Sequence, residues 1–408
     1  MRKFILIKLF IIILASSCVP LNENKIIEFP KIDRKPDPDI YYRDVLTALP
    51  NYSIEDAIAL DLRGYNLSEL DLTNSFDSLM VASFDDRTIW PTINKMPINF
   101  DFQKIMAYGK NPGLCLHSLH ELGYTGKNIG IAIIDQKLLV DHQEYKNQLK
   151  LYEEQGGIVG GRSTMHGTAV ASLAVGKSVG VAPEADLYYI ATRMGNDGSV
   201  NYITTAIKRI LEVNKQLPHN KKIRVILIPV GWKIDSVGVD ELLATIELAI
   251  SKDIFIISSS LESYSPVKFN GIGRYPFADP DNYKVYRPSF WGTSILQEEP
   301  QINDRILVPM DSRVTASPSG IDEYVYYFRG SWSWAMPYLA GIYVLAAQTN
   351  PKITPELFWN VAMDTGRYNY LEYNGMTYEL GPIIDPVAII LKLDNRRKVY
   401  YLSQLRCQ

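Results

Sequence analysis

Three residues combine side chains that could do chemistry with positions that would hold them rigidly. Asp135 ends the apolar run IGIAII, His166 precedes a segment of small residues, and Ser333 opens a long apolar stretch. A serine hydroxyl becomes an effective nucleophile when a neighbouring base takes its proton, and histidine can be that base near neutral pH. A buried carboxylate fixes the tautomer of such a histidine. The alternative interpretation is structural: a histidine at the start of a buried helix and an aspartate that caps a turn.

Alternating strands and helices are predicted to position these side chains. From about residue 114, continuous apolar runs alternate with segments of helical spacing, which indicates a parallel sheet with helices on both faces. Functional groups in such sheets gather beyond the carboxyl ends of the strands, where Asp135 stands. The predicted strands are 129–134, 186–192, 223–231 and 253–260, and a helix is predicted over 240–252.

Several motifs occur in a recognisable order along the chain. HGT begins at His166, GVAP follows it, and Ser333 stands in a Ser-x-Ala-x-Pro pattern with Ala335 and Pro337. Together with the aspartate at the strand end, LVPMDSRVTAS before the serine and NPKITPE after it, they resemble the subtilisin-like serine proteases, the subtilase family, over about residues 114–390.

The resemblance implies an α/β fold of three layers, with a mainly parallel sheet between helices, and a catalytic triad of Asp135, His166 and Ser333. Ser331 competes with Ser333 as the nucleophile, but only Ser333 has the family spacing. We expect Pro337 in the first turn of the following helix, where a missing N–H leaves no intrahelical bond unmade.

The sequence departs from the family pattern where an oxyanion hole is expected. The family has a Gly-Asn pair there, and this chain has Leu261 and Glu262. An ionised carboxylate cannot donate a hydrogen bond, and removing one oxyanion donor costs about 10²–10³ in rate. The candidate replacement donors are the N–H of Ser333 and the hydroxyls of Ser258, Ser259 and Ser260.

The predicted substrate cleft is also altered. The strand VILIPVGW resembles the family segment that pairs with an extended peptide, which implies that Val230, Gly231 and Trp232 line the cleft. Pro229 removes a backbone donor, and Trp232 stands where the family has a glycine. We therefore expect a narrowed or altered cleft.

The first residues predict export. A basic start, a short apolar run ending at Leu14 and small residues precede Cys18, and the run is too short for a membrane span. This arrangement resembles a bacterial lipobox, although Leu14 stands one place early. The resemblance implies a lipid on Cys18 and an extracytoplasmic, membrane-anchored lipoprotein. Ordinary secretion is the alternative.

Changes in composition along the sequence divide the chain into predicted segments. An N-terminal region with a helix beginning after Ser53 is expected to be either a pro-segment or a permanent extension. The predicted divisions are a signal peptide at 1–17, a solvated tether at 18–41, the N-terminal region at 42–113, a catalytic domain at 114–395 and a tail at 396–408.

Composition limits the classes of function. The net charge of −3 argues against a nucleic-acid partner, and the absence of HExxH and CxxC patterns argues against zinc. We expect no cofactor; calcium sites are common in the family, but no compact Asp/Asn loop assigns one. Cys115 and Cys407 could form one disulfide. The predicted function is a serine endopeptidase acting on a peptide or protein, with an inactive subtilase-fold binding protein as the alternative and an esterase as a third.

Overall fold

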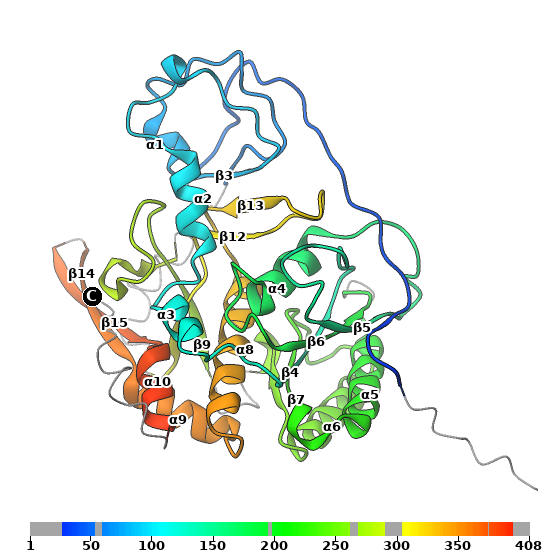
Figure 1. The fold of residues 1–408 in the computed structure, drawn as a ribbon. Coiled ribbons are helices and arrows are strands. Elements are labelled where there is room, and N and C mark those ends of the chain that lie inside the picture. The colour runs from blue at the N-terminus through cyan, green and yellow to red at the C-terminus, as the bar shows by residue number, and fades with distance from the viewer. Residues whose placement is uncertain are drawn as a thin grey trace, which may run out of the picture.

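A wholly parallel sheet of six strands forms the centre of the molecule (Figure 1). The computed structural model describes residues 27–53, 59–194, 198–261, 268–289, 304–373 and 375–394. The strand order is β1-β5-β6-β4-β7-β8. The bounds are β1 (Lys31–Ile32), β4 (Gly130–Asp135), β5 (Leu149–Glu154), β6 (Asp186–Ala191), β7 (Ile223–Leu227) and β8 (Phe255–Ile257).

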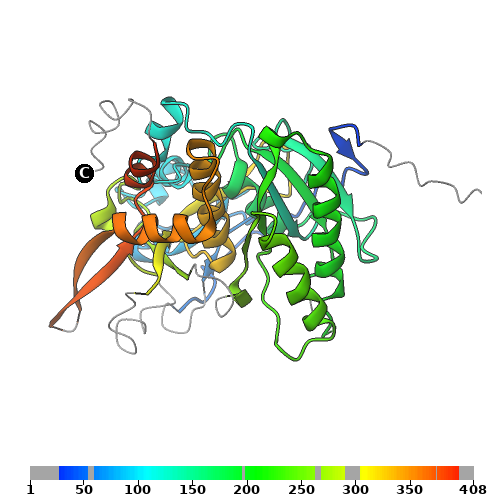
Figure 2. The same cartoon turned by 90° about the horizontal axis from the view of Figure 1, so that it is seen from below.

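Helices cover both faces of this sheet, as the view from below shows (Figure 2). Side chains alternate along a strand, so Ile131 and Ile133 of β4 pack on the face of α4 and α8, while Ala132 and Ile134 pack on the face of α5 and α6. The predicted three-layer α/β fold is therefore confirmed. The bounds are α4 (Met165–Val175), α5 (Asn201–Gln216), α6 (Val239–Ile250) and α8 (Trp332–Thr349).

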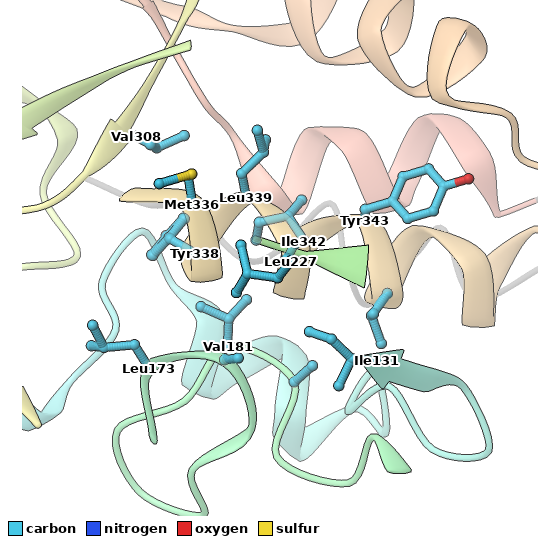
Figure 3. Packing of buried hydrophobic residues seen from close by; sticks show 14 of the residues in the cluster. Ile131, Leu173, Val181, Leu227, Val308, Met336, Tyr338, Leu339, Ile342 and Tyr343 are labelled. Atoms are coloured by element: carbon cyan, nitrogen blue, oxygen red, sulfur yellow. The ribbon is translucent and has the colours of Figure 1, made fainter. Parts of the chain in front are cut away.

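Helix α8 is the central helix of the core. It is apolar on almost every side, which is typical of a helix enclosed by other elements. Figure 3 shows Leu339 and Ile342 of α8 among Ile131 and Leu227 of the parallel sheet and Val308 of another sheet. Because α8 is packed against other elements along most of its length, the position of its first turn is fixed.

Two further sheets flank the central one. One has the strand order β10-β9-β11-β15-β14, and the other has the order β12-β13-β3-β2. Their bounds are β2 (Leu60–Asp61), β3 (Ala82–Asp85), β9 (Phe269–Gly273), β10 (Arg287–Pro288), β11 (Ile306–Pro309), β12 (Arg313–Ala316), β13 (Tyr324–Tyr327), β14 (Arg367–Tyr373) and β15 (Met376–Ile383). The remaining helices are α1 (Phe76–Leu79), α2 (Phe102–Lys110), α3 (Leu116–Glu121), α9 (Pro355–Thr365) and α10 (Pro386–Leu393).

The N-terminal region shares a sheet with the predicted catalytic domain. Strand β3 pairs with β13 in antiparallel fashion, so Val325 and Tyr326 lie opposite Asp85 and Phe84. Backbone hydrogen bonds therefore cross the boundary that the sequence places after residue 113.

The predicted tether is packed against the parallel sheet from residue 27 onward, which differs from the expected solvated segment. Strand β1 pairs with the edge strand β5. Lys31 Nζ lies 2.5 Å from Glu153, and the guanidinium of Arg34 lies 2.6 Å from Glu154. The polar composition of this segment reflects ion pairs with the sheet edge rather than full solvation.

Some predictions fall on residues outside the described part. The signal peptide, Cys18, Glu262, the first turn of the helix expected after Ser53 and the tail all lie there. Within the described ranges, no helix is both long and apolar enough to cross a membrane.

Candidate active site

Asp135 and His166 form a buried hydrogen-bonded pair. Nδ1 of His166 lies 2.8 and 2.9 Å from the two carboxylate oxygens of Asp135. Asp135 is fully buried at the end of β4, whereas the His166 side chain keeps 21% of its surface exposed. Because Nδ1 must donate to the carboxylate, Nε2 is left as the acceptor that a general base requires.

The start of α4 fixes the position of His166. Thr164 caps this helix and accepts from the N–H of Gly167, while its own N–H and hydroxyl both donate to the carbonyl of Lys137 at 3.0 Å. Gly167 has no room for a side chain, because the hydroxyl of Tyr189 and the carbonyl of Gln136 fill that space. The loop after Asp135 and the helix that carries His166 are therefore joined directly.

Charge sets the protonation behaviour of His166. Burial lowers the pKa of its imidazole, but the negative charge of Asp135 and the hydrogen bond to it raise the pKa more, so the pKa is raised overall. The carboxylate thus stabilises the imidazolium that forms when His166 accepts a proton.

His142, the other histidine near the strand end, has a structural role, as the sequence predicts. It is fully buried, its Nδ1 accepts from the N–H of Glu144, and its Nε2 lies 2.9 Å from the carbonyl of Glu323. Burial lowers the pKa of His142. Both ring nitrogens are used, so this imidazole is not available as a base.

Ser333 lies beside the pair, at the start of α8. Its hydroxyl donates to the carbonyl of Pro229 at 3.3 Å. Ile133 of β4 pairs with Leu227, the last residue of β7, so Pro229 lies two residues beyond the paired part of that strand. The ring of the next residue, Trp334, contacts the ring of His166. Among the described residues, no hydrogen bond joins Ser333 to His166 in this conformation, so a rotation of the serine side chain must precede proton transfer.

The helix start supplies a second functional group. Ser333 is the second residue of α8, and its backbone N–H makes no hydrogen bond within the described ranges. The first N–H groups of a helix lack intrahelical partners and carry the positive end of the helix dipole. The N–H of Ser333 is therefore available to stabilise a developing oxyanion.

Pro337 lies one turn further into the helix than the sequence predicts. It is the sixth residue of α8, not part of the first turn. Its missing N–H would otherwise bond to the carbonyl of Ser333, four residues earlier. Proline at this position therefore removes a helical hydrogen bond from the backbone of the candidate nucleophile.

Trp334 contacts His166, an interaction that sequence spacing does not reveal. Its ring meets the ring of His166 edge to face, with centroids 5.8 Å apart, and meets Tyr327 at 5.3 Å. The hydroxyl of Tyr327 accepts from Arg63 at 3.0 Å. A continuous set of contacts therefore runs from the N-terminal region to His166.

Two of the three serines after β8 have hydrogen-bonded hydroxyls, and the third has no partner among the described residues. Ser258 donates to the carbonyl of Val230 at 2.8 Å. Ser260 accepts from the N–H of Trp232 at 2.7 Å and donates to the carbonyl of the same residue at 3.1 Å. The hydroxyl of Ser259 has no partner among the described residues. In this conformation Ser258 and Ser260 hold the loop after β7, and Ser259 remains as a hydroxyl donor.

The predicted substrate segment has few open backbone groups. The N–H of Val230 donates to the carbonyl of Ile228, and the N–H of Trp232 is bound by Ser260. Among the described residues, the N–H of Gly231 is the one of these three backbone donors that has no acceptor, which limits pairing with an extended peptide. Strand β7 itself ends at Leu227 rather than at residue 231.

No group of three or more His, Cys, Asp or Glu side chains is arranged to hold a metal ion in the described part of the chain.

Comparison with known proteins agrees with this geometry over part of the chain. The model of the subtilase family matches residues 126–295, a stretch that includes Asp135 and His166 and ends before Ser333. The structure of the prenylagaramide maturation protease PagA is 15% identical, with a TM-score of 0.45, over 69% of this chain and 99% of that one. The PatG macrocyclase domain is 14% identical, with a TM-score of 0.44, over 69% and 95%. By the family match, residues 126–295 of the chain are similar to the subtilase family.

Proposed function

We propose that the protein is a serine endopeptidase in which Ser333 is the nucleophile, His166 the general base and Asp135 the residue that orients it. The observation that carries the proposal is the hydrogen-bonded Asp135–His166 pair, which leaves Nε2 without a partner among the described residues. The contact between the rings of His166 and Trp334 places this imidazole beside the start of α8. The substrate class is a peptide or protein, as is usual for this family of proteases.

The proposed reaction follows from the positions of these groups. The Ser333 hydroxyl turns from the Pro229 carbonyl toward His166 and transfers its proton to Nε2 as Oγ attacks the peptide carbonyl carbon. The negative oxygen that forms is stabilised by the N–H of Ser333 and the hydroxyl of Ser259. His166 then gives its proton to the leaving amine, and water resolves the acyl-enzyme by the same path in reverse.

A binding protein without turnover is the second candidate, and one observation favours it. The Ser333 hydroxyl is bonded to a backbone carbonyl rather than to His166, and the two serines that flank Ser259 are occupied by the loop after β7. A site that stays in this conformation would bind peptides without cleaving them.

We further propose that the protein works outside the cytoplasmic membrane, anchored by a lipid on Cys18. Cys115 is disulfide-bonded, and disulfides persist mainly in oxidising compartments. Changing Cys18 to alanine is expected to release the protein to the soluble fraction or to block its processing. Unchanged membrane association would contradict the anchor.

The N-terminal region is proposed to be a permanent part of the mature protein. The β3–β13 pairing and the Arg63–Tyr327 hydrogen bond join it to the candidate active site. Intact mass measurement of the active protein should include residues 42–113. Activity in a species that has lost them would identify a pro-segment instead.

Cleavage of an unfolded protein substrate tests the peptidase function. We expect new amino termini with the wild type and none with Ser333→Ala or His166→Ala. Ser331→Ala is the matched control, because its hydroxyl makes no cap hydrogen bond and should keep activity. A folded wild type that binds the substrate without cleaving it would support the second candidate.

A further inference from the structure

A basic cleft of about 710 Å³ lies at the amino-terminal edge of the parallel sheet, opposite the candidate active site. The ends of α5 and α6, the start of β7 and the turn between α8 and α9 form its walls (Figure 1). Five lysine or arginine side chains line it against a single carboxylate, that of Asp253. The basic residues, with one histidine, are Lys215, His219, Lys222, Arg224, Lys252 and Lys352. A chain with a net charge of −3 thus concentrates positive charge here.

Two of these cations are fixed by the fold. Lys222 donates to the carbonyl of Asn214 at 2.5 Å, near the carboxyl end of α5. Arg224 donates to the carbonyls of Pro351 and Ile353 at 2.8 and 2.7 Å. Their acceptors are neutral carbonyls, so the charges of Lys222 and Arg224 are held in the wall of the cleft without being neutralised.

Three other cations are free to meet a ligand. Lys215, Lys252 and Lys352 are exposed, and none forms an ion pair with a carboxylate of the described residues. They come from three separate elements, so their convergence depends on the fold and not on a run of basic sequence.

The first described residue of the chain, Ile27, lies next to this cleft. The N–H of Ile27 donates to the side chain of Gln216 at 2.9 Å, and Gln216 is the last residue of α5, adjacent to Lys215. Eight residues separate Ile27 from Cys18. Even a fully extended segment of this length spans only roughly 30 Å, so a lipid on Cys18 would keep this edge of the molecule close to the membrane.

We propose that the basic cleft is a docking surface for the anionic phospholipid headgroups of the membrane that carries the anchor. Lysine and arginine near an anionic surface each add attraction that salt weakens. Arg224 lies near the start of β7 and Pro229 lies beyond its end, so docking by this edge would turn the candidate active site away from the lipid. The inference builds on the proposed anchor and adds an orientation to it.

The test uses the chain without the predicted signal peptide of residues 1–17 and with Cys18→Ala, which carries no lipid and keeps every described residue. It is sedimented with vesicles of phosphatidylcholine alone or mixed with phosphatidylglycerol. We expect binding to the anionic vesicles only, with release by salt. Reversing the charges of Lys215, Lys252 and Lys352 to glutamate should lower partitioning by roughly 100-fold.

A second triple variant controls for net charge. Lys104, Lys146 and Lys177 are exposed and outside the cleft, so their change to glutamate should lower partitioning far less. Equal losses in the two variants, or equal binding to neutral vesicles, would overturn the proposal. So would displacement by inorganic phosphate at constant ionic strength, or binding to polyglutamate without binding to vesicles. Thermal unfolding and fluorophosphonate labelling of the same samples separate this result from loss of fold or of the proposed catalytic function.

Discussion

The two sides of the candidate active site differ in what their polar groups are bonded to. On the side of β4 and α4, the bonds of Asp135 and His166 leave Nε2 of the imidazole open. On the side of β7 and β8, Ser258 and Ser260 are bonded to the backbone of the facing loop. The general base is therefore already oriented in the folded state, although Ser333 must still rotate toward it. Oxyanion and substrate binding, in contrast, depend on few free hydrogen-bond donors. We expect a competent nucleophile with slow turnover.

The largest loss of activity is expected from a change at Asp135, on the side of β4 and α4. Asp135→Asn replaces an acceptor by an amide that can bond to the wrong tautomer of His166, so kcat should fall about 10⁴-fold. Peptide-cleavage kinetics measure the loss. Asp141→Asn is the control, because Asp141 is exposed and pairs with Lys35 outside the site. A loss below tenfold would mean that His166 is not the base.

On the side of β7 and β8, separate changes of the neighbouring Ser259 and Ser260 distinguish their two roles. Ser259→Ala should lower kcat by about 10²–10³, because it removes a free donor beside the site. Ser260→Ala should lower kcat less and raise KM, because it releases the loop at Trp232. The reverse order of effects would assign the oxyanion to Ser260 and show that its hydroxyl turns away from Trp232 during the reaction.

Loss of the contact between the N-terminal region and the residues around His166 is expected to have a smaller effect. Arg63→Ala removes the hydrogen bond to Tyr327, which packs against Trp334, and should lower the free energy of unfolding by about 2 kcal/mol. Denaturant titration measures this change. Arg162→Ala is the control, since Arg162 is exposed and lies 3.6 Å from Asp39. Equal stability in the two variants would show that the contact contributes little.

The smallest predicted effect is a shift in pH dependence. His166 must be neutral to accept a proton, and its pKa is raised, so activity should be lost as pH falls through a value above the ordinary one of about 6.5. The charged pair stabilises the fold below the pKa of unfolded His166 and loses this contribution as pH rises through the folded pKa. A pH–rate profile with its acid limb below about pH 6 would contradict the proposed Asp135–His166 coupling.

The central strands and the Asp135–His166 pair could be predicted because both depend on local signals. Apolar runs of β-branched residues mark buried strands, and the HGT motif places a histidine where Gly167 permits close contact with Tyr189 and Gln136. The position of Pro337 in the helix could not be predicted, because α8 begins after Ser331 without a side-chain cap hydrogen bond that would mark its start.

The hydrogen bonds of Ser258 and Ser260 to the loop after β7 could not be predicted either. Ser260 meets Trp232 across 28 residues of sequence, through backbone atoms that carry no residue-specific signal. The ion pairs of Lys31 and Arg34 with β5 are more remote still, across 122 and 120 residues, and they make a polar segment part of the fold.

Labelling with a fluorophosphonate tests the central claim most directly, because the reagent reports an activated serine without requiring peptide binding. Wild-type protein should form a covalent adduct that mass spectrometry maps to Ser333. Ser333→Ala should abolish the adduct, and Asp135→Asn should slow its formation. Folded, correctly processed wild-type protein that stays unlabelled, or an adduct on another serine, would contradict the proposed triad.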